Sequence, residues 1–305
     1  MSKVLVVGSL NMDFVLDVKN MPKPGETILA KGLNFVPGGK GANQAFAMGK
    51  LGTDVGMIGA IGKDEYGEKL LCNLKSVNVN TDGIITMPNE NTGCAFVNVD
   101  EHGENSIVVV GGTNQKITKQ MIDEHSELID EADIIVMQLE IPIDVVAYIA
   151  KLAKDKGKYV ILDPAPARAD LPDELFKNID IIKPNETEVQ ILTCKKAETI
   201  EELVEAGKVL LKKGVKNVIV TLGGSGSILI NENGHKKFET MDVKVIDTTA
   251  AGDSFTAALT KGLVENKSVE EAIEFAHLVS AIVCTKKGAQ TSIPSMDEIE
   301  KFIKN

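Results

Sequence analysis

The sequence predicts an α/β fold: a three-layer sandwich in which helices flank a mainly parallel central sheet, with a small antiparallel β lid added. Short runs rich in β-branched residues are nearly continuous in apolarity, as in strands buried on both faces of a parallel sheet. Amphipathic segments separate these runs, so strands and helices alternate as in right-handed β-α-β units. The predicted strands of the central sheet are residues 3–8, 55–60, 133–138, 158–163, 179–182 and 216–222.

Amphipathic periodicity predicts the helices that connect these strands. Two of them carry lysines late and end near Gly157 and Gly214, which are typical helix stops. The C-terminal third, residues 251–304, is predicted to be helical apart from a loop at 286–295. The connecting helices are predicted at residues 40–51, 65–76, 142–156 and 200–213.

Two regions break the alternation and predict the lid. One contains two strand-like segments with no helix between them, and the other is a hairpin turning around residues 100–103. These four segments, which do not fit easily into a parallel sheet, are residues 14–18, 27–36, 93–99 and 104–110. We expect a single domain, residues 1–305, with the lid formed by about 13–36 and 92–111 inserted in it. The alternative is an antiparallel extension at the edge of the central sheet.

The composition argues against several classes of partner. A formal charge of −11, with charges of both signs well mixed, argues against nucleic acid, whose phosphates need clustered Lys and Arg. No apolar run approaches the roughly 20 residues of a membrane span, and residues 3–8 are too short for the core of a signal peptide. The cysteines lie far apart without metal-binding spacing, which predicts reduced, mostly buried thiols. We therefore expect a cytoplasmic protein that binds neither nucleic acid nor a membrane.

Residues 247–255, Asp-Thr-Thr-Ala-Ala-Gly-Asp-Ser-Phe, carry the strongest chemical signal. Ala250, Ala251 and Gly252 lead into Asp253, and an apolar helical pattern then begins. The start of a helix offers free N–H groups and the positive end of the helix dipole. Such a site can hold a phosphoryl group while the carboxylate of Asp253 takes a proton from an attacking hydroxyl. The pattern predicts a phosphotransferase.

Two segments near the N-terminus predict a binding site for a small polyol. Asn11 and Asp13 follow the first strand, and ligands of open α/β sheets bind beyond the carboxyl ends of strands. A carboxylate can accept hydrogen bonds from two neighbouring hydroxyls, although an Asx-capped turn is the alternative for both residues. Residues 37–45 place paired glycines at the start of a helix, with Asn43 on its first turn. Lys40 is followed by Gly, so this is not a P-loop, and a plain glycine-rich helix start is the alternative.

Further segments give weaker signals. Residues 221–226, Thr-Leu-Gly-Gly-Ser-Gly, lie between two strands and favour a tight turn over a dinucleotide-binding fingerprint. Asn185 and Glu188 are spaced as the N-cap and N3 residues of a helix. Glu140 and Asp163 each follow a strand, and either can enter the cleft or cap the next helix.

Taken in order, these motifs resemble those of the ribokinase family of carbohydrate kinases. The resemblance rests on Gly-Gly-Lys-Gly-Ala-Asn-Gln-Ala, Asn-Glu-Thr-Glu and Asp-Thr-Thr-Ala-Ala-Gly-Asp-Ser-Phe, and it extends from Gly8 to Ser292. It implies a ribokinase-like fold and transfer of the γ-phosphate of ATP to the 5-hydroxyl of D-ribose. The alternatives are a kinase of deoxyribose, fructose or adenosine, and a non-catalytic sugar-binding regulator. The intact Asp253 and its small-residue anion hole argue against the regulator.

The resemblance also implies roles for the matching residues. Asp253 would be the base, and backbone N–H groups across Ala250, Ala251, Gly252 and Asp253 would form the anion hole. The sugar would be held by Asn11, Asp13, Gly39, Lys40, Asn43 and Glu140, together with Asp253. The ATP site would be lined by Asn185, Thr221, Gly223, Gly224, Ser225, Gly226, Gly252 and His277, although a core histidine is the alternative for His277.

Metal ions and a partner subunit are implied in the same way. Glu188 would organise Mg²⁺ through water, because Mg²⁺ keeps much of its hydration shell. A monovalent cation, normally K⁺, would be bound by Asp247, Thr249, Val283, Lys286, Gly288 and Ser292, several through backbone carbonyls. The lid would cover the sugar with one face and form a homodimer through the other. Ala250 stands where glycine is commoner in the family, which restricts the backbone there.

Overall fold

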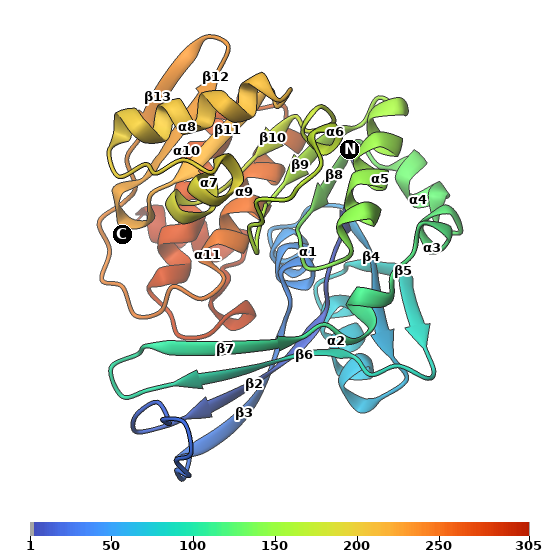
Figure 1. Ribbon diagram of the computed structural model, residues 1–305, viewed down its shortest axis with the longest axis vertical. Helices are drawn as coiled ribbons and strands as arrows, with labels where there is room; N and C mark the ends of the chain where they lie inside the picture. The colour runs from blue at the N-terminus through green and yellow to red at the C-terminus, as the bar shows by residue number, and fades with distance from the viewer. Residues whose placement is uncertain (1–2, 305) are drawn as a thin grey trace.

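The computed structural model describes residues 3–304, and its centre is a nine-stranded sheet between two layers of helices (Figure 1). The strand order is β13-β12-β11-β10-β9-β8-β1-β4-β5. All neighbours from β11 to β5 are parallel, whereas β12 and β13 add an antiparallel hairpin at one edge. The strands are β1 Val4–Val7, β4 Val55–Gly62, β5 Asn80–Met87, β8 Ile134–Met137, β9 Tyr159–Leu162, β10 Ile181–Ile182, β11 Asn217–Thr221, β12 Ser227–Asn231 and β13 Gly234–Phe238.

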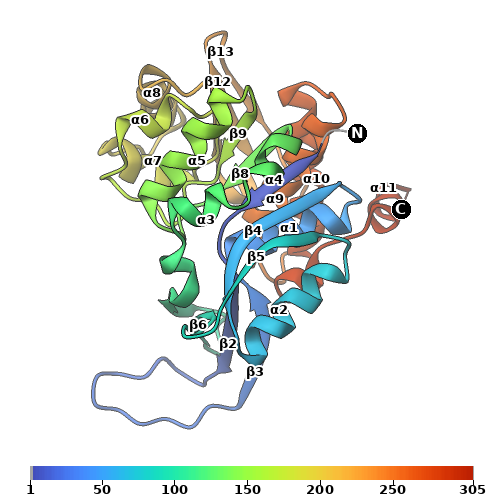
Figure 2. The ribbon, with the colours of Figure 1, turned by 90° about the vertical axis from the view of Figure 1, so that its right-hand side faces the viewer.

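Alternate side chains of the central strands enter two separate cores. In β1, Val4 and Val6 join one cluster while Leu5 and Val7 join the other, as the period of a strand requires. The two helical layers lie on opposite faces of the sheet (Figure 2). One face packs on α1 Lys40–Lys50, α2 Glu65–Lys75, α9 Ala251–Val264, α10 Val269–Cys284 and α11 Met296–Lys304. The other packs on α3 Lys119–Asp123, α4 Ser126–Glu131, α5 Ile143–Asp155, α6 Asp173–Phe176, α7 Glu186–Thr193 and α8 Ile200–Lys212.

The strand order reverses between β1 and β8. From β1 the chain runs outward through β4 and β5, then returns to place β8 on the other side of β1. A crevice opens at such a reversal beyond the carboxyl ends of the strands, and it is where open α/β sheets bind ligands. The segments that follow β1 and β8 therefore mark the position in which to seek the site.

A separate four-stranded sheet, here called the smaller sheet, lies to one side of the main body (Figure 1). It is made of β2 Asn11–Asp17, β3 Gly32–Gly38, β6 Gly93–Val99 and β7 Asn105–Val110, in the order β3-β2-β6-β7. The structure thus has a distinct sheet and not an extension of the central one. Its outer pairs are antiparallel, but β2 and β6 are parallel, because each continues from a parallel part of the main sheet.

Some details of the sequence prediction need correction. The strand expected over residues 27–36 begins only at Gly32, since residues 27–31 belong to the long loop between β2 and β3 (Figure 2). β5, β13 and the short helices over 119–131 were not predicted, because edge strands and short helices carry many polar residues. The cysteines are not mostly buried: Cys72 and Cys194 are exposed and the other two intermediate. Within residues 3–304, no helix has the length and apolarity that crossing a membrane requires.

Candidate active site

Polar side chains meet at the reversal point, where a cavity of about 360 Å³ opens between the main body and the smaller sheet. Asn11 follows β1 and Glu140 follows β8, and both line this cavity. The Glu140 carboxylate accepts hydrogen bonds from the Ser9 hydroxyl and, at 3.0 Å, from the backbone N–H of Lys40. Glu140 therefore enters the cleft, and the N-cap of α5 is Pro142 instead.

Asn11 is held in the cleft by a second amide that the sequence reasoning missed. Asn114 donates from Nδ2 to Asn11 Oδ1 at 2.8 Å, and its own Oδ1 accepts from the Leu10 N–H at 3.0 Å. Gly93 leaves room for this bond, since a Cβ there would lie 2.4 Å from Asn11 Oδ1. Asn11 begins β2, so the Asx-turn alternative does not hold for it.

Gly39 allows the chain before α1 to approach the reversal point closely. Its φ of 86° is in the left-handed region, and a Cβ would lie 2.7 Å from the backbone nitrogen of Asn11. Two residues on, a Cβ at Gly41 would lie 2.6 Å from the Ser9 nitrogen. Gly39 and Gly41 thus bring the N-terminus of α1 against the loop after β1. A plain helix start would not require this close approach of two backbone segments.

Asp253 is the best-supported carboxylate of the cleft. It lies in the first turn of α9 with 6% of its surface exposed. Oδ2 accepts a hydrogen bond from Asn43 Nδ2 at 2.9 Å, and Oδ1 accepts one from Gln44 Nε2 at 3.1 Å. Asn43 is in turn fixed by Gln290, whose Nε2 donates to Asn43 Oδ1 at 2.9 Å. Both carboxylate oxygens are therefore oriented by amides.

Gln44 extends this network to a second buried carboxylate. Its Nε2 also donates to Asp163 Oδ2 at 2.9 Å, and its Oε1 accepts from Gln138 Nε2 at 2.6 Å. Asp163 follows β9 and forms an ion pair of 3.4 Å with Lys183, which follows β10. Asp163 is therefore buried against Gln44 and Lys183, and it does not cap the next helix, whose N-cap is Pro172.

Negative charge accumulates around Asp13 and Lys40. Burial, with the nearby charges of Glu140 and Asp253, raises the pKa of Asp13 to about 7. Burial by itself lowers the pKa of Lys40, but the carboxylates around it outweigh that effect and raise the pKa above its ordinary value. The carboxylates that act on Lys40 are Asp253, Asp163, Glu140 and Glu188. Lys40 is thus a fixed cation between the acidic groups of the site.

The N-terminus of α9 has the backbone of an anion hole. Ala250 is its N-cap, with φ 61° and ψ 9°, a left-handed conformation that is costly for a residue with a Cβ. The N–H of Ala251 donates to the Thr248 carbonyl at 3.1 Å. The N–H groups of Gly252 and Asp253 follow in the first turn, where a helix provides no acceptor of its own. These two amides are donors that the predicted anion hole can offer.

The predicted nucleotide segments lie side by side. Asn185 and Glu188 form a capping box at the start of α7, with both backbone-to-side-chain bonds at 2.8 Å. Asn185 also forms an isolated parallel bridge with Thr221, at the end of β11. Asn185 therefore caps α7 and also lies beside the start of the turn at 221–226. Burial raises the pKa of Glu188.

The glycines of the turn at 223–226 serve two different purposes: one is required by packing, and two leave the backbone open. Gly226 has φ 92° and a Cβ there would lie 1.9 Å from the Phe238 carbonyl oxygen, so packing requires glycine. Gly223 and Gly224 have no heavy atom of the described chain within 4 Å of a Cβ position, so they present bare backbone to open space. Open backbone at this point is suited to close approach of a ligand.

His277 lies in the middle of α10 and is only 6% exposed. Its Nε2 is 2.8 Å from the hydroxyl of Ser227, and its ring packs edge-on against Phe255 at 5.1 Å. Burial lowers the pKa of His277 to about 4, so the ring is neutral at pH 7. This position matches the core-histidine alternative. The hydrogen bond to Ser227 also fixes the residue that directly follows the turn at 223–226.

The segments expected to bind a monovalent cation meet at Asp247. Its Oδ1 accepts from the Thr249 N–H at 2.9 Å and the Thr249 hydroxyl at 2.7 Å, and its Oδ2 accepts from the Gly288 N–H at 2.8 Å. Although burial opposes it, these bonds hold the pKa of Asp247 below its ordinary value. The carboxylate thus ties the loop before α9 to the loop after α10.

The remaining members of that set surround the C-terminus of α10. Val283 is fully buried, and its carbonyl accepts the Lys286 N–H at 3.1 Å. The Lys286 side chain forms an ion pair with Glu298 at 2.8 Å. Ser292 is buried, and its hydroxyl donates to the Ala289 carbonyl at 2.6 Å.

Residues 1–296 match the description "pfkB family carbohydrate kinase". The chain belongs to the pfkB family of carbohydrate kinases. A ribokinase of Haemophilus influenzae is 40% identical over 300 residues, which cover 98% of each chain.

Solved structures agree with this pfkB-family assignment. The crystal structure of a ribokinase from Thermotoga maritima has a TM-score of 0.92 and 40% identity, covering 100% of both chains. The structure of Arabidopsis thaliana ribokinase complexed with ribose and ATP has a TM-score of 0.93 and 38% identity, covering 100% of this chain and 99% of that one.

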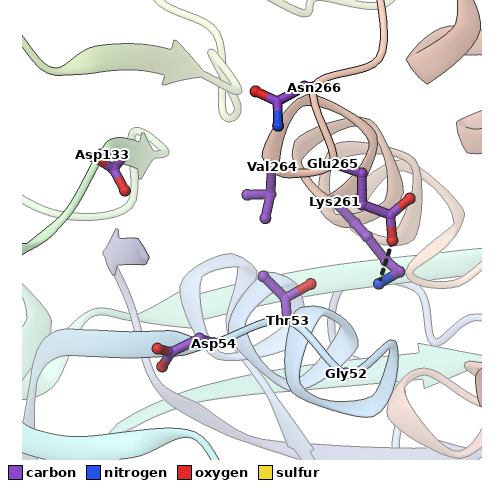
Figure 3. Close-up of a pocket in the computed structure, with 8 residues that line it drawn as sticks. All are labelled: Gly52, Thr53, Asp54, Asp133, Lys261, Val264, Glu265 and Asn266. Atoms are coloured by element: carbon purple, nitrogen blue, oxygen red, sulfur yellow. Dashed lines mark ion pairs between the residues drawn. The ribbon is translucent and has the colours of Figure 1, made fainter. Parts of the chain in front are cut away.

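A larger cavity of this pfkB-family chain, about 560 Å³, lies at the opposite edge of the sheet (Figure 3). It is bounded by Asp54 and Asp133, which directly precede β4 and β8, and by the last turn of α9. Lys261 there forms an ion pair with Glu265 at 2.9 Å, drawn as a dashed line in Figure 3. The larger of the two cavities is therefore not the candidate site, because it lies at the amino ends of the strands and far from Asp253.

Proposed function

We propose that the chain is a sugar kinase that transfers the γ-phosphate of ATP to the 5-hydroxyl of D-ribose, giving ribose 5-phosphate and ADP. The observation that carries the proposal is Asp253, which is oriented by Asn43 and Gln44 at the N-terminus of α9. The ribokinases at 40% identity, and the relative whose structure contains ribose and ATP, support the choice of substrates.

Asp253 acts as the general base in this proposal. Its carboxylate takes the proton of the sugar hydroxyl as that oxygen attacks the γ-phosphorus, the new O–P bond forms, and the bond from phosphorus to the ADP oxygen breaks. The N–H groups of Gly252 and Asp253 stabilise the charge that develops on the transferring phosphoryl group. Orientation of both carboxylate oxygens by amides keeps the base aligned with the hydroxyl.

The cleft between the main body and the smaller sheet supplies the sugar site. Asp13 and Glu140 accept hydrogen bonds from hydroxyls, and Asn11 can both donate and accept. Lys40 balances these carboxylates and donates to the sugar. We assign to the sugar Asn11, Asp13, Gly39, Lys40, Asn43 and Glu140.

ATP is assigned to the neighbouring segments at the starts of α7 and α9. The open backbone of Gly223 and Gly224 suits close approach of the nucleotide. His277 orders the turn through Ser227. The residues assigned to contact ATP are Asn185, Thr221, Gly223, Gly224, Ser225, Gly226 and Gly252, with the buried His277 behind them as a support for the turn.

Two cations fit the residues present. Glu188 uses Oε2 for its helix cap, so Oε1 can hold the water shell of a Mg²⁺ bound by the ATP phosphates. The oxygen atoms of Asp247, Thr249 and Val283 that could act as cation ligands lie at the C-terminal end of α10. The negative end of the helix dipole there favours a cation. Lys286, Gly288 and Ser292 complete a K⁺ site, which supplies counter-charge to Asp247 when filled.

The smaller sheet is assigned two roles within one kinase domain. Asn11 and Asp13 lie on the face turned toward the cleft, together with Ile107 and Val109. That face covers the sugar. The other face, which exposes Phe35, Phe96 and Val108, pairs with a second copy of the chain. ATP as donor and four free cysteines favour a cytoplasmic location.

An ATP-consumption assay tests the proposal. Purified protein is given ribose, 2-deoxyribose, fructose or adenosine, with KCl or tetramethylammonium chloride. Ribose should give the highest kcat/KM, and K⁺ should raise the rate. The Asp253→Asn variant should keep ribose binding while kcat falls at least roughly 10²-fold. Faster use of another acceptor would reject ribose, equal rates in both salts would reject the cation site, and near-normal turnover in Asp253→Asn would reject the base.

A further inference from the structure

Lys183 is a buried lysine for which neither the sugar site nor the fold accounts. It is the first residue after β10, at the edge of the sheet that carries Glu140 and Asp163. Only 4% of its surface is exposed. Lysines are almost never this buried unless their charge is matched by acceptors.

The ammonium of Lys183 lies beside the anion hole. A Cβ built on Gly252 would be 3.6 Å from Lys183 Nζ, so glycine at this position leaves the space between the ammonium and the first turn of α9 open. The N–H groups of Gly252 and Asp253 come from that same turn. A group bound by these amides therefore lies within reach of Lys183 as well.

Asp163 is an incomplete partner for this ammonium. The ion pair is 3.4 Å long, whereas charge-assisted bonds of this type are about 2.7–2.9 Å. Asp163 Oδ2 is shared with Gln44, and its buried Oδ1 has no hydrogen-bond partner within the described residues. Lys183 carries three donors, so the pair holds the ammonium in place while leaving donors for an anion.

We propose that Lys183 is a catalytic residue that binds the γ-phosphoryl group of ATP, with Asp163 as the counter-ion that positions it. This inference rests on the proposed kinase function. Two lysines of the cleft then have different roles: the partly exposed Lys40 balances the carboxylates around the sugar, and the buried Lys183 offsets the phosphate charge that grows in transfer.

The test uses Lys183→Met and Lys183→Arg in the full-length protein. The γ-phosphate distinguishes ATP from ADP, so Lys183→Met should weaken ATP binding at least ~10-fold and ADP binding less than ~3-fold, measured by calorimetry. Its kcat with ribose should fall ~10²-fold, with the KM for ribose within ~3-fold of wild type. Lys183→Arg should recover part of the kcat because it keeps the charge. Equal weakening of ATP and ADP binding would overturn the proposal.

Two further variants separate phosphate binding from folding. Lys183→Met combined with Asp163→Asn removes both buried charges, while the asparagine oxygen can still accept from Gln44. This double variant should be folded and as slow as Lys183→Met; recovery of kcat and of ATP over ADP preference would show a structural role only. Lys154→Met is the matched control, because Lys154 pairs at 2.8 Å with the buried Asp180 at the opposite end of β10. It should leave the kcat and the nucleotide preference unchanged.

The outcomes also separate this proposal from the function on which it rests. If the wild-type protein consumed no ATP with ribose, the proposed function would fail, while the comparison of ATP with ADP binding would still report on Lys183. If the wild type phosphorylated ribose and Lys183→Met did so equally well, the function would stand and the role of Lys183 would be rejected.

Discussion

Gln44 Nε2 lies 3.1 Å from Oδ1 of Asp253, and through this bond α1 orients the carboxylate that we propose as the base. Gln44 is fully buried, and its Oε1 is fixed by Gln138 at 2.6 Å. The amide therefore cannot turn without breaking several bonds at once. We therefore infer that Gln44 is a positioning residue, which would act on the proposed reaction through Asp253.

Replacement of Gln44 by methionine should slow turnover with little effect on substrate binding. The side chain keeps its size but no longer donates to Asp253, and a small misplacement of a reacting group costs up to ~10²-fold. We expect kcat to fall ~10–10²-fold, with the KM for ribose changed less than ~3-fold. Gln190→Met is the control, since the Gln190 side chain bonds the Glu186 carbonyl and the Ala197 N–H and contacts neither Asp253 nor Asp163. A parallel change in kcat and KM would instead indicate general disruption of the cleft.

The raised pKa of Asp13, about 7, predicts a pH dependence of ribose binding. The ionised carboxylate accepts hydrogen bonds from sugar hydroxyls, so the KM for ribose should fall as pH rises from about 6 to 8 and then level off. Asp13→Asn should bind ribose more weakly and lose this dependence in steady-state kinetics. A wild-type KM that is flat over this range would contradict the assignment.

The same shift predicts the sign of a stability change. The folded pKa of about 7 lies above the ordinary 3.8, so between these values the folded protein holds a proton that the unfolded chain has lost. The contribution of Asp13 to the free energy of unfolding should therefore decrease as pH rises from about 4 to about 7. Urea unfolding should be measured for wild type and Asp13→Asn at several pH values across this range. The free energy of unfolding should fall less steeply with rising pH in the variant than in wild type.

Ala250→Gly should stabilise the protein. An L-residue in the left-handed conformation costs about 1–2 kcal/mol, while glycine loses about 0.4–1 kcal/mol more entropy on folding. The net expectation is a gain of roughly 0.5–1 kcal/mol in the free energy of unfolding, read from urea titration. Ala257→Gly, at a buried right-handed position of α9, should lose about 1 kcal/mol. A loss in both variants would mean that backbone strain at residue 250 is negligible.

The sequence predicts most of the central sheet because parallel strands buried on both faces leave a strong local signal. Val4–Val7 and Ile134–Met137 are apolar at every position, so their assignment needs no tertiary information. β5 begins Asn80-Thr81-Asp82 at an exposed edge, and its first residues are no more apolar than a loop. Its formation depends on pairing with β4, which local patterns do not encode.

The candidate site divides in the same manner. Asn43 and Asp253 stand in recognisable motifs, and the structure brings them within 2.9 Å of each other. Lys183 and Asn114 stand in no motif, and their importance comes only from what folding places beside them. One signal for Lys183 is present in the sequence, since a charged residue that follows a buried strand at the carboxyl edge is a candidate for the cleft.

The exposed face of the smaller sheet is the basis of the last prediction. Direct strand partners share a face, so Phe35, Phe96 and Val108 lie on the side away from Asp13, and they are 49%, 40% and 60% exposed. A patch of large apolar side chains on the edge of a small sheet is typical of a protein interface. Tyr66 of α2 packs against Phe35 on this face, with ring centroids 6.1 Å apart, and the parts of the three side chains that stay exposed are open to a second copy.

Val108→Lys should therefore convert a dimer into a monomer, because pairing would bury the new charge without a partner. Sedimentation velocity at micromolar protein should give a single species near 32.7 kDa for the variant and twice that mass for wild type. Ile107→Lys provides a closely matched control: the two positions are adjacent and similarly exposed, but Ile107 lies on the sugar-facing side. It should remain dimeric and raise the KM for ribose. A monomeric wild type, or loss of the dimer in Ile107→Lys alone, would place the interface elsewhere.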